Sequence, residues 1–278
     1  MKNLIERLLL FVFAVPAVMV LPLVLYHFNF LALFLVCGTV FIIAIYEVHK
    51  ILKHSYSVYH FSFFICVALL NFVFLYFFTY NKIKLQTFLL GFVISIFSLV
   101  ILEIIVSQRH GFEKSLERIL TGVFILLYPI WLGDFFLMLT QLQRPRLSIA
   151  IFFIIIISCD SLAWLFGMLF GKGNRGIIAA SPKKSVAGFV GVAVSILLLS
   201  VLAYYFAPNF LSFPRTLIVM GITHLFAVVG DLFESLLKRA VNVKDSGSIV
   251  MGRGGILDTI DSLLLAAPAY FFLCNLFL

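Results

Sequence analysis

Long apolar runs, broken by short charged segments, follow one another along the whole chain. A helix needs about 20 apolar residues to cross a hydrocarbon core, and this pattern predicts nine such spans. The predicted spans cover residues 5–26, 28–47, 59–80, 84–106, 118–141, 147–170, 186–207, 214–237 and 260–278. A transmembrane barrel would need segments of about ten residues that alternate polar and apolar, whereas IAIFFIIIIS is apolar on every face. We therefore predict an all-α, polytopic transmembrane helical bundle.

Composition agrees with this prediction, because 63% of the residues are hydrophobic and only 12% are charged. Such a chain has too little polar surface for a water-soluble globule. The first apolar run resembles a signal peptide, but it carries Glu6 and leads directly into further spans, so we interpret it as a retained first helix. The four cysteines lie singly in apolar runs without CxxC spacing, which indicates packing and neither a disulfide nor a zinc site.

The 20 basic residues are unevenly distributed between the two sides of the predicted bundle. If nine spans alternate, one side holds Lys2, Arg7, Lys50, Lys53, Arg109, Lys114, Arg118, Lys172, Arg175, Lys183, Lys184, Lys238, Arg239, Lys244 and Arg253. The other side holds Lys82, Lys84, Arg144, Arg146 and Arg215. Because Lys and Arg are retained in short cytoplasmic loops, this bias predicts a multi-pass protein of the inner membrane with its amino terminus and long polar loops in the cytoplasm. The net charge of +8 fits basic loops beside anionic headgroups and does not imply nucleic-acid binding.

The two halves of the chain differ in composition. Residues 1–142 contain short charged loops and no phosphate-binding pattern, which predicts a structural series of helices. The exception is Asp134, an acid within an apolar run, which is either functional or caps a helix break after Gly133. Residues 143–278 contain the glycine- and lysine-rich segments, so we predict that this half is the catalytic region, with cytoplasmic polar loops.

The segment GKGNRGIIAASPKKSVAG joins the sixth and seventh predicted spans. Pro182 prevents a continuous helix, and the glycines allow backbone amides to approach a ligand closely. Together with Lys183 and Lys184, these amides suit a di- or triphosphate. The same composition also fits a solvated basic loop that binds only lipid headgroups. The chain has no GxxxxGK[ST] phosphate loop, and no GxGxxG follows a strand, which excludes the common soluble nucleotide folds.

Acidic residues gather near the end of the chain, where five of the 12 lie within one polar stretch: Asp231, Glu234, Asp245, Asp258 and Asp261. The spacings of three and four residues place Asp231 with Glu234 and Ser235, and Asp258 with Asp261, on shared helical faces. Converging carboxylates need a cation, and oxygen ligands suit magnesium completed by substrate phosphates. The neighbouring Lys and Arg side chains then bind phosphate. A charge-balanced interfacial loop with internal salt bridges is the alternative.

The stretch SLLKRAVNVKDSGSIVMGRGGILDTID resembles the signature of the phosphatidate cytidylyltransferases, SxxKRxxxxKDxGxxxPGHGGxxDRxD. Upstream, CDSLAWLFGMLFGK resembles the family's DxxAYxxGxxFGK segment, and SPKKSVAGFVG resembles SPKKTxEGxxGG. The resemblance covers about residues 155–278. It implies a membrane enzyme that converts phosphatidate and CTP to CDP-diacylglycerol and pyrophosphate, requires a divalent metal and forms a homodimer.

The expected roles follow from the matched positions and from the carboxylates at the two membrane boundaries that flank the polar loop. Magnesium, alone or with a second cation, is expected at Asp231, Asp258 and Asp261, and catalysis at these three with Lys238 and Arg239. Substrate binding is expected at Asp160, Ser181, Lys183, Lys184, Ser235, Lys244, Asp245 and Arg253. The phosphatidate phosphate is already an anion, so the expected mechanism needs no strong general base.

The chain departs from the family pattern at a few positions. Arg253 stands where the family has His, Thr259 where it has Arg, and Ala187 where it has Glu. Residues 248–251 also lack the usual proline. The metal-binding carboxylates are retained, whereas the cations that recognise phosphate differ.

Two other functions fit parts of the pattern. Many spans and acids such as Asp134 and Asp160 also suit a transporter or channel, although no repeat relates the two halves. A CTP-using enzyme that acts on another lipid acceptor, such as a prenol or ether lipid, is the nearer alternative.

Overall fold

The computed structural model describes residue 16 and residues 19–207, 210–250 and 254–278. Within these residues the chain is helical and forms no β-strand, only isolated bridges of Arg175 with Ser185 and of Val250 with Gly254. The described part contains eight helical segments long and apolar enough to cross a membrane. These segments confirm the predicted polytopic helical bundle, while the first predicted span falls largely outside the described residues.

Each of the other eight predicted spans corresponds to an observed helical segment. In chain order the elements are α2 (His27–Lys53), α3 (Phe61–Thr79), α4 (Leu85–His110), α5 (Ser115–Ile125), η1 (Leu126–Trp131), α6 (Leu132–Met138), η2 (Leu139–Gln141), α7 (Pro145–Phe170), α8 (Val186–Phe206), α9 (Phe213–Ala240) and α10 (Leu257–Phe277). The predicted span 118–141 is one segment divided into four elements, because Pro129 lies inside it. Proline has no N–H to donate, and the chain passes it in η1, a π-helical turn.

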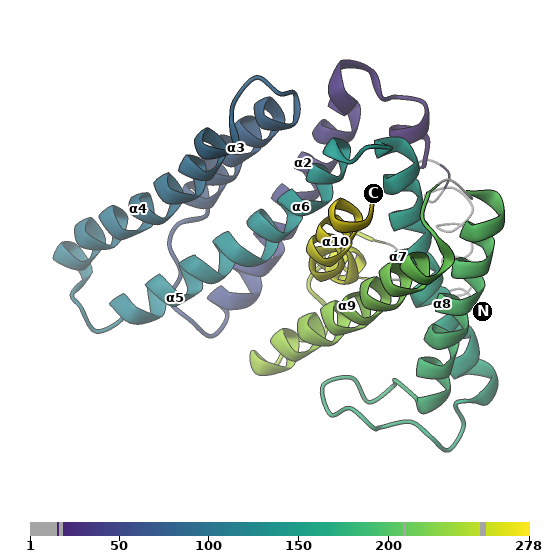
Figure 1. The fold of residues 1–278 in the computed structure, drawn as a ribbon. Helices are drawn as coiled ribbons and strands as arrows, with labels where there is room; N and C mark the ends of the chain where they lie inside the picture. Colours follow the sequence, from purple (N-terminus) through teal and green to yellow (C-terminus); the bar gives the residue numbers. More distant parts are fainter. Residues whose placement is uncertain (1–15, 17–18, 208–209, 251–253) are drawn as a thin grey trace.

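Helix α10 lies at the centre of the bundle (Figure 1). It packs mainly against α9, and also against α6, α2 and α7. In Figure 1, α3, α4 and α5 lie on one side of this centre, α7 and α8 lie on the other, and α9 runs along α10. The buried hydroxyl of Tyr270 donates to the carbonyl of Ser148 over 3.0 Å, which ties α10 to α7. The helix that carries Asp258 and Asp261 is therefore held on several sides.

Glycines allow two close helix crossings beside the polar stretch. A Cβ atom at Gly230 of α9 would lie 2.5 Å from the carbonyl oxygen of Asp261 in α10. A Cβ atom at Gly191 of α8 would lie 2.4 Å from the carbonyl oxygen of Leu162 in α7. Both distances are too short for any other residue without movement of the backbone. The absence of a side chain at these glycines thus sets the spacing of the four helices in the second half.

Contacts between the connections show which ones share an end of the bundle. At one end, Glu117 accepts a hydrogen bond from the amide of Ser57, and Lys184 forms an ion pair with Asp231. At the other end, Gln141 donates to the carbonyl of Phe78 and Arg215 to that of Phe277. The connections α2–α3, α4–α5, α7–α8 and α9–α10 are at the first end, because each helical segment crosses the bundle once. We call this end the site-bearing end.

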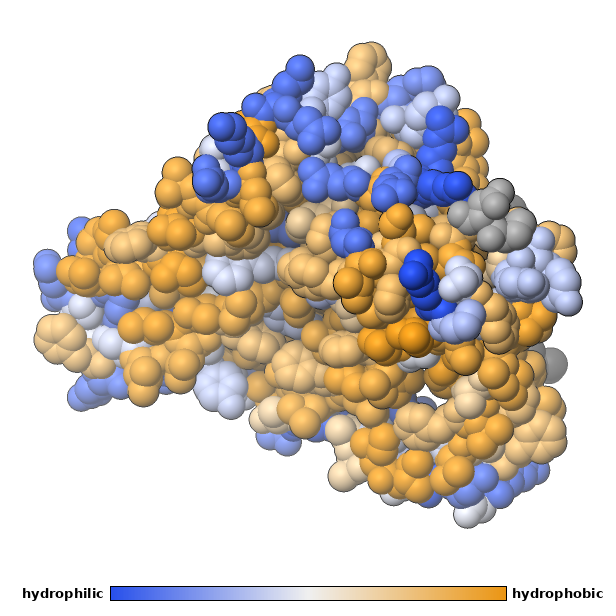
Figure 2. Space-filling view, viewed as in Figure 1, coloured by the Kyte–Doolittle hydropathy of each residue, from blue (hydrophilic) through white to orange (hydrophobic). Residues whose placement is uncertain are grey.

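The outer surface suits a lipid environment. Figure 2 shows that most of the visible face is hydrophobic, with hydrophilic residues gathered along its upper edge and at its margins. Large apolar side chains are exposed along the outer helices, among them Phe97 of α4 and Leu197 of α8. Exposed apolar surface on this scale is stable in a bilayer and not in water. The chain is therefore a membrane protein.

Buried polar side chains of the first half form a cluster at the site-bearing end. Arg118 donates two hydrogen bonds to Glu103, of 2.9 and 2.6 Å, and the hydroxyl of Tyr59 donates to the same carboxylate over 2.7 Å. Burial and this hydrogen bond raise the pKa of the Tyr59 hydroxyl above its ordinary value. The cluster fastens the α2–α3 connection to α4 and α5.

Candidate active site

The last turns of α9 carry the acidic face that the spacing predicts. Asp231 forms an ion pair of 2.6 Å with Lys184, which comes from the α7–α8 connection. One turn later, Glu234 forms an ion pair with Lys238 of the same helix. Ser235 lies half-buried in the same turn. The predicted phosphate loop and the predicted metal ligand of α9 are thus in direct contact.

Lys238 joins α9 to the beginning of α10. Its ammonium group pairs with the carboxylates of both Glu234 and Asp258. Glu234 is only 1% exposed, and among the described residues its oxygens have no hydrogen-bond partner besides this ion pair. Removal of Lys238 would leave the buried carboxylate of Glu234 without a partner and take one of four partners from Asp258, at a cost of about 3–5 kcal/mol.

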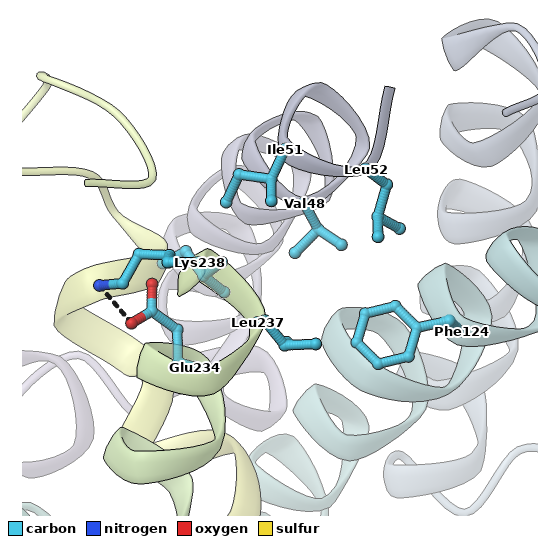
Figure 3. A pocket seen from close by; sticks show the side chains of 8 residues that line it. Val48, Ile51, Leu52, Phe124, Glu234, Leu237 and Lys238 are labelled. Carbon is cyan, nitrogen blue, oxygen red and sulfur yellow. Dashed lines mark ion pairs between the residues drawn. The ribbon is translucent and has the colours of Figure 1, made fainter. Parts of the chain in front are cut away.

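A small cavity lies beside this pair. Figure 3 shows Glu234 and Lys238 pointing toward each other, with Val48, Ile51 and Leu52 of α2 opposite them. The cavity is otherwise lined by apolar side chains. Its volume of about 10 Å³ is close to the least space that a water molecule needs. The side chains that α2 supplies to this cavity are apolar, so the polar contact of Glu234 in the cavity is its ion pair with Lys238.

The carboxylate of Asp258 is held in place by four groups, which belong to three residues. Besides Lys238, its carboxylate accepts hydrogen bonds from the amide of Ser246 over 3.0 Å, the hydroxyl of Ser246 over 2.9 Å and the amide of Gly255 over 2.7 Å. Gly254 has a φ of 109°, and a Cβ atom there would lie 2.5 Å from this carboxylate. The glycines of the signature therefore let the backbone fold around Asp258.

Asp261 lies one turn further along α10, in a different environment. Its side chain is buried and accepts a hydrogen bond of 2.5 Å from the amide of Ser262. The charges of Asp231, Asp160 and Glu234 act on its carboxyl group. Asp258 is joined to α9 through Lys238, and Asp261 lies where Gly230, the residue before Asp231, crosses α10.

The α7–α8 connection is shaped by its own hydrogen bonds. The amide of Lys184 donates to the carbonyl of Ser181 over 3.0 Å, and the amide of Gly176 donates to the carbonyl of Lys184 over 3.2 Å. The hydroxyl of Ser185 then accepts from the amide of Gly188 and caps α8. Lys183 is exposed, whereas Lys184 is turned toward α9. The loop therefore presents Lys184 to Asp231 and the preceding residue, Lys183, to solvent.

Like the side chains of Lys183 and Ser235, four further predicted residues are not brought into these contacts by any interaction that the structure describes. Arg239 is exposed and donates to the carbonyl of Val243 over 3.4 Å. Lys244 and Asp245 are exposed in the connection that follows α9. Arg253 lies outside the described residues. The roles of these four residues stay predictions.

Two of the departures from the family pattern have a visible local role. The hydroxyl of Thr259 donates to the carbonyl of Gly255 over 3.1 Å, within the first turn of α10. Ala187 is buried in the first turn of α8. Neither side chain brings a charge to the site.

Sequence reasoning missed Glu47. This residue belongs to α2, in the half that the sequence assigns a structural role, and it is in contact with Ser246, Ile256 and Leu257. A carboxylate at the end of the apolar run IAIY is the same signal that singles out Asp134, but it coincides with a predicted span boundary. An acidic side chain of the first half, that of Glu47, therefore contacts the site.

The described carboxylates do not by themselves form a complete site for a metal ion. Among the residues that the structure describes, no three His, Cys, Asp or Glu side chains are arranged to hold one. Magnesium commonly uses one or two protein carboxylates and takes its other ligands from substrate phosphates and water. Asp231 and Asp261, which lie at the crossing of α9 with α10, fit that need better than Asp258, whose oxygens already have four partners.

Comparisons with known proteins point to one family. The model of the cytidylyltransferase family matches residues 5–277. The phosphatidate cytidylyltransferase of Rickettsia felis is 39% identical over 170 residues, which cover 58% of this chain and 71% of the relative. That of Rickettsia prowazekii is 38% identical over 167 residues, covering 56% and 70%, and that of Staphylococcus saprophyticus is 32% identical over 172 residues, covering 62% and 66%.

Proposed function

The chain belongs to the cytidylyltransferase family, and we propose that it catalyses the reaction for which its relatives are named. It transfers the cytidylyl group of CTP to phosphatidate and forms CDP-diacylglycerol and pyrophosphate. The observation that supports this proposal most directly is the ion pair of Lys184 with Asp231. It joins the lysine-rich loop, expected to bind phosphates, to the carboxylates of α9 and α10.

The reaction requires that the two reacting phosphates be aligned and that the charge on the leaving group be neutralised. An oxygen of the phosphatidate phosphate forms a bond to the α-phosphorus of CTP, and the bond from that phosphorus to the bridging oxygen of pyrophosphate breaks. The nucleophile is already an anion, so no side chain has to remove a proton. The task of the protein is to hold two anionic phosphates in line and to balance the charge that develops on the leaving group.

Basic side chains at the site-bearing end suit this task. Lys183 is exposed and Lys184 is close to Asp231, so the α7–α8 connection is suited to hold the phosphates of CTP. Lys238 is buried between Glu234 and Asp258, which suits it to position these carboxylates. Arg239 and Lys244 are exposed next to this end and remain available to a lipid phosphate.

We assign magnesium to Asp231 and Asp261, with Asp258 as the neighbouring carboxylate that orients the beginning of α10. When bound, the metal would neutralise charge on the phosphates of CTP. In the absence of substrate, the proximity of Lys184 to Asp231 partly balances this carboxylate. The proposal therefore includes a movement of Lys184 from Asp231 to a CTP phosphate when nucleotide and metal bind.

Location and assembly follow from the same proposal. The bias of basic residues favours the inner membrane, with the site-bearing end in the cytoplasm, where CTP is available. Phosphatidate would enter sideways from the lipid while its chains stay in the bilayer. A homodimer is the expected assembly.

Labelled CTP tests the proposal directly. Purified protein in mixed micelles, given CTP, magnesium and phosphatidate, is expected to produce labelled CDP-lipid and one pyrophosphate for each turnover. Omission of the lipid, or chelation of the metal, should stop both products. Parallel reactions with a prenol, a prenyl phosphate or an ether lipid identify the acceptor. Absence of any CDP-lipid, together with solute flux through reconstituted vesicles, would show that the protein is a transporter.

A further inference from the structure

Glu47 is a buried carboxylate that binds a segment about 200 positions away in the chain. It lies in α2 and is 2% exposed. One oxygen accepts from the amide of Ile256 over 3.1 Å, and the other accepts from the amide of Leu257 over 2.7 Å and lies 2.9 Å from the hydroxyl of Ser246, whose one proton is shared with Asp258. These contacts of one buried carboxylate form a specific attachment.

The attachment is made where α10 begins. The first N–H groups of a helix have no partner within it, and a negative charge near them is favourable. Leu257 is the first residue of α10, and Ile256 precedes it. Glu47 of α2 thus acts as an external cap for the helix that carries Asp258 and Asp261, and no side chain of the helix itself caps it.

The polar segment before α10 is built closely around this carboxylate. A Cβ atom at Gly247 would lie 2.3 Å from one oxygen of Glu47, and a Cβ atom at Gly255 would lie 2.4 Å from the other. Both glycines belong to the signature stretch. Their lack of a side chain is therefore required by Glu47, as well as by any ligand that approaches the backbone.

Ser246 connects Glu47 with Asp258. Its hydroxyl lies 2.9 Å from an oxygen of each carboxylate, and its amide donates to Asp258 over 3.0 Å. A continuous series of polar contacts therefore runs from Glu47 through Ser246, Asp258 and Lys238 to Glu234. A shift of Glu47 would be passed on to the carboxylates that face the proposed substrates.

We propose that Glu47 is a positioning residue of the active site: it fixes the beginning of α10 and, through Ser246, the orientation of Asp258. The inference rests on the proposed cytidylyl transfer for its kinetic consequence, but the attachment itself can be measured without turnover. By this proposal the amino-terminal half of the chain takes part in building the catalytic region.

Glu47→Gln is the central variant. Glutamine has the same shape but a single acceptor oxygen, so its NH₂ group must face the amide of either Ile256 or Leu257. We expect faster hydrogen–deuterium exchange of the amides between Ser246 and Leu257. We also expect a fall in kcat of about 10- to 100-fold, because a small misplacement of reacting groups is costly. The KM for CTP should change much less, since the α7–α8 connection is untouched.

Glu103→Gln is the matched control. Glu103 is also a buried carboxylate with three donor contacts, from Arg118 and Tyr59, but it lies on α4. This variant should lower thermal stability and leave both kcat and the exchange of the 246–257 amides unchanged. Glu47→Asp, which keeps the charge on a shorter side chain, should recover part of the kcat that Glu47→Gln loses.

Ser246→Ala supplies a second measurement that does not depend on the folding of the Glu47 variants. It removes the hydroxyl between Glu47 and Asp258 and keeps the bonds of Glu47 to Ile256 and Leu257. We expect a lowered kcat with normal exchange of the Leu257 amide. The proposal is overturned if folded Glu47→Gln exchanges and turns over as the unmodified protein does, or if Ser246→Ala leaves kcat unchanged. If the unmodified protein makes no CDP-lipid, the proposed function fails, while the exchange data still decide whether Glu47 fixes α10.

Discussion

At the scale of single residues, Asp261 offers the most direct test of the proposed metal site. Its side chain is 7% exposed, and the charges of Asp231, Asp160 and Glu234 all act on it. Asp261→Asn keeps the shape and removes the charge that a cation would balance. We expect kcat to fall by about 100-fold or more, as when an electrostatic group of a transition state is removed, and the magnesium concentration for half-maximal rate to rise. Steady-state CTP turnover against magnesium concentration measures both.

Asp134→Asn is the control for that variant. Asp134 is also a buried aspartate, 5% exposed, but it lies on α6 beside α2 and α3. Its substitution should leave turnover and magnesium dependence as they are. If Asp261→Asn folds normally and retains both, Asp261 is not a metal ligand. If Asp134→Asn also abolishes turnover, loss of a buried carboxylate has a general effect on the fold, and neither result assigns a ligand.

Local spacing predicted the residues that converge within the second half. Asp231 and Glu234 share a helical face, and the register of the signature placed Asp258 and Asp261 at the beginning of the last span, so their approach to α9 was foreseeable. The contacts of Glu47 could not be predicted in this way. Hydropathy and motif spacing describe neighbours in the chain, and the partners of Glu47 lie 199 to 210 positions away.

At the scale of helices, the crossing of α9 and α10 should depend on one glycine. A methyl group at Gly230 would meet the carbonyl oxygen of Asp261 at 2.5 Å, so Gly230→Ala must push the two helices apart. We expect a loss of about 1–3 kcal/mol in stability, as for other overpacked cores, and a fall in kcat because Asp261 moves. Gly221→Ala on the same helix has open space around it, and should be neutral or stabilise α9 by up to about 1 kcal/mol. Thermal unfolding in detergent and CTP turnover of both variants test this contrast, and equal behaviour of the two would contradict the close crossing.

The helices themselves were predicted from apolar length, and their ends were less well predicted. The span predicted to end at residue 47 continues to Lys53, and the one predicted from residue 260 begins at Leu257. In both places the helix extends past its apolar run, and polar residues of the extensions bind protein groups: His49 contacts the carbonyl of Tyr59, and Asp258 accepts from the amide of Gly255. Glu47 and Asp258 lie in or at the edge of these extensions, which is why hydropathy alone left their partners unassigned.

At the scale of the whole molecule, the alternation of eight described segments places the site-bearing connections at one end. The structure fixes which connections share an end, as the contacts of Ser57 with Glu117 and of Gln141 with Phe78 show. The bias of Lys and Arg favours a cytoplasmic site-bearing end.

Single cysteines test this orientation. The four native cysteines, Cys37, Cys66, Cys159 and Cys274, are first replaced by serine or alanine, and CTP turnover confirms that the resulting protein is folded. Lys172→Cys then places an exposed thiol in the α7–α8 connection, and Lys82→Cys places one in the α3–α4 connection at the opposite end. With a membrane-impermeant maleimide, we expect the thiol at position 82 to react in intact spheroplasts and the thiol at position 172 to react only after the membrane is disrupted. The reverse result would put the CTP site outside the cytoplasm, where the proposed substrate is absent, and would contradict the orientation and the proposed reaction together.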